Sequence, residues 1–248
     1  MNIFYFNESK AKELLVSNYR HSQLIPFFGT GLTKGEKAKR GTVPDGKMLL
    51  DELRREIKKS KNISESDKDS ILSNTRSLKG IFDFFEDDDV IDGCARRNYL
   101  INTFCGVKIN SVKRQLLNLD WPSIVSLNID DAIESATDGY HLITPNKKIS
   151  LERVKSSKCI IKLHGCANEY AHYEDTKIIF TWRSYADSIH TNKSLLHYIQ
   201  AIAESTAFVF IGCSLDEELD LMQIPQPMVF SKSIFIKKGK PDFAEKKI

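Results

Sequence analysis

The chain has 248 residues, of which 41% are hydrophobic and 28% are charged, as is usual for a soluble globular protein. Its 36 basic and 33 acidic side chains give a net charge of +3, too small an excess to indicate nucleic-acid binding. The N-terminus has no basic segment followed by an apolar one, and the longest apolar run, AFVFIGC, is too short to cross a bilayer. We therefore expect a cytoplasmic protein that binds neither nucleic acid nor a membrane.

The first half of the chain is predicted to contain one strand and several helices. Residues 8–19 have apolar positions at helical spacing. Residues 24–28 form an apolar strand that runs into the glycine-rich turn GTGLT, although Pro26 removes a ladder hydrogen bond. Residues 46–117 carry helical stripes without a strand signal, which predicts a helical insertion that serves as a lid or as an assembly surface.

In the second half, strands and helices alternate. The segments SIVSLNID, CIIKLHG, AFVFIGCSLD and SIFIKKG are predicted strands, and HLITP and KIIFTW are weaker candidates. A helix is predicted at 192–205, with His197 on it, whereas 166–180 is expected to be an acidic loop. His172 and His190 are also expected in loops.

Buried strands that alternate with helices predict an α/β fold, a Rossmann-like parallel sheet with helices on both faces. We expect one domain over residues 1–248, with the helical insertion at about 46–117. The end of the chain soon after the last strand predicts that this domain is the N-terminal part of a longer protein.

The five cysteines are irregularly spaced and include no C-x-x-C pair. The odd number argues against a disulfide framework, and the absence of such pairs excludes a zinc module built on them. Cys166 lies two residues after His164, but no further ligand is near them in the sequence. We therefore expect ordinary core thiols, no zinc ribbon and no bound metal.

Four predicted strands end in small or polar residues, at FFGTGLT, VSLNID, KLHGC and FIGCSLD. In an open parallel sheet, ligands bind beyond the carboxyl ends of the strands. The residues expected to converge at this edge are Gly29, Thr30, Gly31, Thr33, Asn128, Asp130, His164, Gly165, Gly212 and Ser214.

Each of these segments has a structural alternative. Glycines 29 and 31 would let the backbone approach a phosphate beside the amides of a following helix, but an ordinary strand-to-helix turn fits GTGLT equally well. Asn128 could hold a sugar hydroxyl or a water, whereas Asp130 or Asp131 could cap the helix DAIESA and leave the other aspartate free. His164 could be a structural residue, but its place at a strand end favours an acid or base.

Taken in order from about residue 24 to 236, these segments resemble the sirtuin superfamily. GTGLT is similar to that family's Gly-Ala-Gly-Ile-Ser turn, which wraps the NAD pyrophosphate, and PDG at 44–46 is a weak echo of its Pro-Asp-Phe. LNID is close to Gln-Asn-Ile-Asp, which lines the nicotinamide and ribose pocket. LHG matches the segment of the catalytic histidine, and GCSL is similar to the Gly-Thr-Ser-Leu that contacts the adenosine ribose.

The resemblance implies a role for each matching residue. The implied catalytic residues are His164, Asn128 and Asp130. The implied NAD-binding residues are Gly29, Thr30, Gly31, Leu32, Thr33, Asp45, Gly212 and Ser214.

The chain departs from the deacylating sirtuins, which carry a four-cysteine zinc ribbon after the HG segment. It is more similar to the zinc-free sirtuin-like domains of bacterial antiviral systems. That resemblance implies an NAD+ glycohydrolase that depletes NAD in anti-phage defence by abortive infection. It also implies a homo-oligomer or a sensor partner. The alternatives are an NAD-dependent protein deacylase or ADP-ribosyltransferase, and a nucleotide-binding sensor without catalysis.

Overall fold

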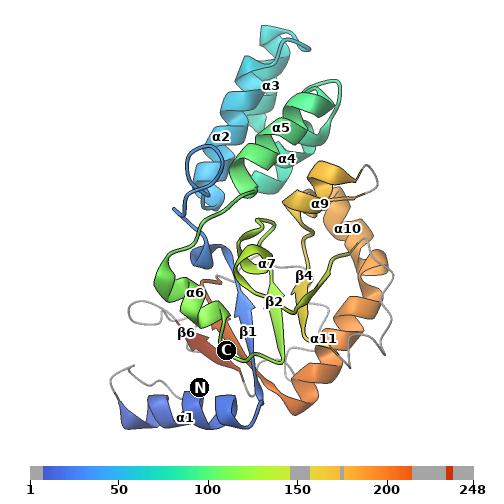
Figure 1. The fold of residues 1–248 in the computed structure, drawn as a ribbon. Coiled ribbons are helices and arrows are strands. Elements are labelled where there is room, and N and C mark those ends of the chain that lie inside the picture. Colours follow the sequence, from blue (N-terminus) through green and yellow to red (C-terminus); the bar gives the residue numbers. More distant parts are fainter. Residues whose placement is uncertain (1–7, 146–156, 174–175, 214–232, 237–248) are drawn as a thin grey trace.

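The computed structural model describes residues 8–145, 157–173, 176–213 and 233–236, and Figure 1 shows their arrangement. The strands are β1 (Leu24–Phe28), β2 (Ser123–Ser126), β3 (His141–Ile143), β4 (Cys159–Lys162), β5 (Ala207–Ile211) and β6 (Ile234–Ile236). All their pairings are parallel, in the order β3-β4-β2-β1-β5-β6. This Rossmann-like sheet confirms the predicted fold class.

Helices surround the sheet. They are α1 (Ser9–Arg20), α2 (Gly46–Lys59), α3 (Glu65–Asn74), α4 (Leu78–Glu86), α5 (Gly93–Phe104), α6 (Ser111–Leu117), α7 (Ala132–Ala136), α9 (Ala167–His172), α10 (Trp182–Thr191) and α11 (Lys193–Ser205). None of the helices in the described part of the chain is long and apolar enough to span a membrane.

The alternation of side chains along each strand divides the core between the two faces of the sheet. On one face, Leu24, Phe28 and Ile124 join a cluster that includes Ile133 of α7. On the other face, the neighbouring strand residues pack against α11: Ile25, Phe27, Val125, Ile161, Phe208 and Phe210 meet Leu195, Leu196 and Ile199. Each such side chain contributes about 1.5–3 kcal/mol when it is fully buried. The prediction of helices on both faces is therefore confirmed.

Pro26 is tolerated inside β1 because of where its missing N–H would point. The amide of Ala207 donates to the carbonyl of Gln23, so odd-numbered residues of this segment face β5 and Pro26 faces β2. The pairing of β1 with β2 begins only at Phe27, which lies opposite Val125. The proline therefore falls at the start of that ladder.

The helical insertion begins each of its five helices with a capping side chain. Asp45, Ser64, Ser77, Asp92 and Asn110 accept hydrogen bonds from the first backbone amides of α2 to α6. Helices α2 to α5 stand together beyond the end of β1, whereas α6 lies beside the sheet (Figure 1). The insertion thus rises from the edge where the strands end.

Three of the predictions for the second half were wrong. KIIFTW is not a strand: its last residues lead into α10, which Thr181 caps in a reciprocal arrangement with Ser184. The predicted acidic loop contains α9, so His172 ends a helix, and His190 lies within α10. HLITP does form the edge strand β3, and His197 lies on α11 as expected.

Candidate functional site

The sheet has its switch point between β1 and β5. From β1 the chain adds β2 and β4 on one side, and it then adds β5 and β6 on the other. Ligands of open α/β sheets bind beyond the strand ends at such a point. The loops that meet here are the glycine turn after β1 and the segment that begins at Gly212 after β5.

Close contact between these two loops explains their glycines. The amide of Gly29 donates to the carbonyl of Ile211 at 3.1 Å, and the amide of Gly31 donates to the carbonyl of Gly212 at 2.9 Å. A Cβ atom on Gly31 would lie 2.6 Å from the Cα of Gly212, and Gly212 itself has a φ of +69°. A side chain at either position would force the two loops apart.

The turn itself is a single 3-10 turn at Thr30–Leu32 rather than the start of an α-helix, since the next helix, α2, begins at Gly46. The amides of Leu32, Thr33 and Lys34 donate to carbonyls of Gly29 and Thr30. No helix begins directly after the turn, so the amides of a following helix cannot bind a phosphate here as predicted. A pyrophosphate bound here has to use other donors, such as the exposed side chains of Thr30 and Lys34.

Asp45 connects the glycine turn to the insertion. Its carboxylate caps α2 by accepting from the amide of Met48 at 2.8 Å, and it pairs with the ammonium group of Lys34 at 2.6 Å. The hydrogen bonds from Lys34 and from Met48 hold the pKa of Asp45 below its usual range. These structural contacts do not test the predicted role of Asp45 in NAD binding.

A polar cluster joins the ends of β1 and β2. The hydroxyl of Thr33 donates to Oδ2 of Asp130 at 2.7 Å and accepts from Nδ2 of Asn128 at 3.0 Å. Asn128 is only 3% exposed, and its Oδ1 has no hydrogen-bond partner in the described structure. Since buried polar atoms are normally satisfied, this oxygen is suited to a group supplied by a ligand.

Neither aspartate after Asn128 is free. Asp130 accepts from the amide of Ala132 at 3.2 Å through the oxygen that does not contact Thr33. Asp131 accepts from the amides of Gly106 and Val107 at 2.6 and 2.9 Å, which fixes the segment after α5. One aspartate, Asp130, thus binds the first amide of α7 as expected, but the expectation that the other aspartate is free is wrong.

Burial sets the protonation of Asp130. Its removal from water raises the pKa to about 6, although Lys162 and the Thr33 hydroxyl both favour the carboxylate. This acid consequently changes charge in a pH range where most aspartates are fully ionised.

Lys162 was missed by the sequence analysis, although a lysine inside the apolar run CIIKLHG is an unusual signal. It is fully buried and donates to the backbone carbonyl of Asp130 and to Oε1 of Glu134, the latter at 2.6 Å. Burial lowers the pKa of Lys162, but Glu134, Cys166 and Asp130 together raise it above its ordinary value. The ammonium group therefore stays charged and ties β4 to the loop after β2.

Cys166 is an inert member of this buried network. Its thiol donates to Oε1 of Glu134 at 3.1 Å, and burial raises its pKa to about 12. The part of the chain that the structure describes holds no group of three or more His, Cys, Asp or Glu that could bind a metal ion.

His164 follows β4 in register with Asn128. Ser126 and Lys162 are paired across β2 and β4, so Asn128 and His164 each lie two residues beyond the same rung of the sheet. His164 is 3% exposed, and its Nε2 lies 3.2 Å from the hydroxyl of Tyr185, which the sequence analysis also missed. Gly165 has a φ of +89°, and a Cβ there would lie 2.6 Å from the carbonyl oxygen of Lys177. The glycine after the histidine is therefore required by the backbone.

The structure thus brings most of the predicted residues to one edge. Hydrogen bonds join Thr33, Asn128 and Asp130, and backbone contacts join Gly31 to Gly212. His164 follows the adjacent strand. Ser214 lies outside the described residues.

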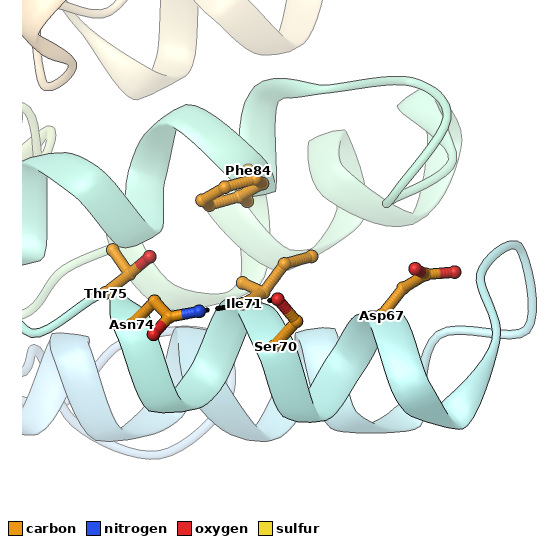
Figure 2. Close-up of a pocket in the computed structure, with 6 residues that line it drawn as sticks. All are labelled: Asp67, Ser70, Ile71, Asn74, Thr75 and Phe84. Carbon is orange, nitrogen blue, oxygen red and sulfur yellow. Dashed lines mark hydrogen bonds between the residues drawn. The ribbon is translucent and has the colours of Figure 1, made fainter.

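A cavity of about 300 Å³ lies elsewhere, between α3 and α4 of the insertion. Figure 2 shows its lining, which is formed by Asp67, Ser70, Ile71, Asn74, Thr75 and Phe84. None of these is a strand-end residue, so this cavity is not part of the candidate site.

An open parallel sheet with polar side chains beyond its carboxyl ends defines the class of Rossmann-like α/β proteins. Within that class, the family model of the SIR2-like domain matches residues 122–227, a range that includes Asn128, Asp130, His164 and Gly212. This match supports a place in the sirtuin-like superfamily for that part of the chain, and it supports an NAD-related function. No curated protein matches the chain.

Proposed function

We propose that this chain is an NAD+ glycohydrolase that cleaves the bond between nicotinamide and ribose, with NAD+ as the substrate and no metal. One observation carries the proposal. Asn128 is buried, is held by Thr33, and presents a carbonyl oxygen without a partner at the strand-end edge. A ribose hydroxyl or a water molecule would supply the missing hydrogen bond.

The remaining residues divide between binding and chemistry in this proposal. The glycine turn, from Gly29 to Thr33, would contact the pyrophosphate, with Asp45 acting through its ion pair with Lys34. Gly212 and Ser214 would contact the adenosine side. The match to the SIR2-like domain supports this assignment for Gly212 and Ser214, since both lie within the matched range.

The chemistry is a displacement at the anomeric carbon of the ribose. The C–N bond breaks with its electron pair going to nicotinamide, a C–O bond forms with water, and one proton is released. The transition state resembles an oxocarbenium ion, as in glycoside hydrolysis. The carboxylate of Asp130 would stabilise the positive charge, and His164 would accept a proton from the water or from a ribose hydroxyl.

The proposed biological role is NAD depletion in bacterial anti-phage defence. The resemblance to zinc-free sirtuin-like domains supports it, and so does the family match. In this role the chain would act as a homo-oligomer or with a sensor protein that triggers it. In cells that carry the complete system, His164→Ala should abolish NAD loss after infection, whereas unchanged NAD loss would contradict the role.

The test of activity measures free nicotinamide after incubation of the protein with NAD+. Wild-type protein should release nicotinamide without any peptide, and His164→Ala and Asn128→Ala should release at least 100-fold less. His197→Ala is the matched control, because this exposed histidine lies on α11 and should leave the rate unchanged.

Other outcomes would replace the proposal. Release that requires an acylated peptide would indicate a deacylase, and transfer of ADP-ribose to protein would indicate a transferase. Saturable NAD+ binding without release, by the chain together with its partner, would indicate a sensor.

A further inference from the structure

Tyr185 contacts the imidazole of His164 from a helix that the sequence analysis did not find. Its hydroxyl lies 3.2 Å from Nε2, and the two rings meet edge to face with centroids 5.3 Å apart. Tyr185 is 4% exposed and lies in the first turns of α10. A buried phenol at this distance is a hydrogen-bond partner of the ring nitrogen.

Helix α4 of the insertion packs against the same residues. The ammonium group of Lys79 lies 4.5 Å from the ring centroid of Tyr185 and 4.8 Å from that of Trp182. One turn further along α4, the ring of Phe82 lies 4.8 Å from that of Phe180, which in turn lies 6.4 Å from the ring of His164. Two contacts of α4 therefore converge on the two aromatic residues that surround the histidine.

We propose that Tyr185 is a positioning residue for His164, and that α4 of the insertion holds Tyr185 in place through Lys79. This inference rests on the proposed function, in which His164 exchanges a proton. A neutral imidazole carries its proton on one of two nitrogens, and its ring can rotate in a cavity. In this proposal Nε2–H donates to the hydroxyl of Tyr185, which fixes the ring orientation and leaves Nδ1 as the unprotonated nitrogen that accepts the proton. The insertion then helps to position His164, through the contact of Lys79 with Tyr185.

The tautomer of His164 can be measured without any substrate. Protein labelled with ¹⁵N-histidine contains six labelled rings, and a His164→Gln variant identifies the signals of His164. In the wild type, the two ring nitrogens should show the well-separated shifts of a single neutral tautomer. In Tyr185→Phe, which removes only the hydroxyl, these shifts should move toward the average of two tautomers. Tyr173→Phe is the matched control, because Tyr173 is 63% exposed.

Activity provides the second measurement. Tyr185→Phe should lower kcat for nicotinamide release by about tenfold and leave KM nearly unchanged, as expected for one lost hydrogen bond that does not contact substrate. Lys79→Met should shift the His164 signals in the same direction by a smaller amount, whereas Lys58→Met, at an exposed position on α2, should not shift them.

The possible results are distinct. His164 signals that stay unchanged in Tyr185→Phe would overturn the positioning role, whatever the activity. Unchanged signals in Lys79→Met, with altered signals in Tyr185→Phe, would overturn the part assigned to the insertion. If the wild type releases no nicotinamide even with any partner it requires, the proposed function fails, while the ¹⁵N spectra still decide the contact.

Discussion

Lys162 offers a sharp test of how the site is held together. The change Lys162→Met keeps an unbranched side chain of similar length and removes the charge. In the structure it takes away the donor to the carbonyl of Asp130 and the partner of Glu134, whose ion pair with Lys162 measures 2.6 Å. Lys162 is fully buried, so its ammonium group is shielded from solvent.

The size of the effect follows from the burial of this ion pair. Removal of one partner from a buried ion pair costs about 3–5 kcal/mol, because the other charge loses its compensation. The side chain of Glu134 is 17% exposed, which places the expected loss near the lower end of that range, at about 3 kcal/mol. For a domain of this size, such a loss lowers Tm by about 6–12 °C.

A double variant separates the ion pair from its surroundings. Lys162→Met with Glu134→Leu removes both charges, so it should be more stable than Lys162→Met alone. Urea unfolding followed by circular dichroism measures all three proteins. Lys158→Met is the control, because the side chain of Lys158 is 45% exposed in its ion pair with Asp120. A loss below about 1 kcal/mol in Lys162→Met would show that the pair is no stronger than an exposed one, since exposed ion pairs contribute up to about 1 kcal/mol.

Three further predictions concern protonation, packing and reactivity. Folding raises the pKa of Asp130 to about 6 from its unfolded value of 3.8. Its contribution to the free energy of unfolding should therefore fall by about 3 kcal/mol as the pH rises from about 3 to about 7, and Asp130→Asn should lack this decrease. If the wild type and this variant show the same pH dependence, the shift is absent. Gly31→Ala should cost about 1–3 kcal/mol, because its Cβ would lie 2.6 Å from the backbone of the loop after β5. Gly46→Ala, whose nearest neighbour would be 3.9 Å away, is the control, and an equal cost would contradict the packing argument. Iodoacetamide at pH 8 should label the exposed Cys94 in the native protein long before Cys166, whose pKa is about 12. Equal labelling rates at these two thiols, measured by mass spectrometry, would contradict the burial of Cys166.

Much of the fold could be predicted because the buried strands are continuous apolar runs. LIPFF, CIIK and AFVFI carry β-branched or aromatic side chains on both faces, as the inner strands of a sheet covered on two sides require. KIIFTW has the same composition and yet forms no strand. Both edges of β4 are already paired, with β2 and with β3, so this segment has no place beside it. Local composition contains no information about which edges are occupied.

The candidate site was partly predictable for a similar reason. Asn128 and His164 follow adjacent strands, so the topology alone places them near each other. Tyr185 could not be found in this way, because its contact with His164 depends on α10, which the sequence analysis did not predict although Trp182, Tyr185 and Ala186 recur there at helical spacing. Lys162 appeared in the sequence only as a polar residue in an apolar strand, and its partner Glu134 lies 28 residues earlier.

The central claim is that the buried residues at the strand ends hydrolyse NAD+. The most direct measurement follows the products of NAD+ in water enriched in ¹⁸O, with the complete protein and any partner it requires. Nicotinamide and ADP-ribose should form in equal amounts, with the label in ADP-ribose, and a folded His164→Ala variant should form both at least 100-fold more slowly. Hydrolysis at the wild-type rate by that variant would contradict the role of His164, and the absence of NAD+ cleavage by the complete protein would contradict the proposed activity.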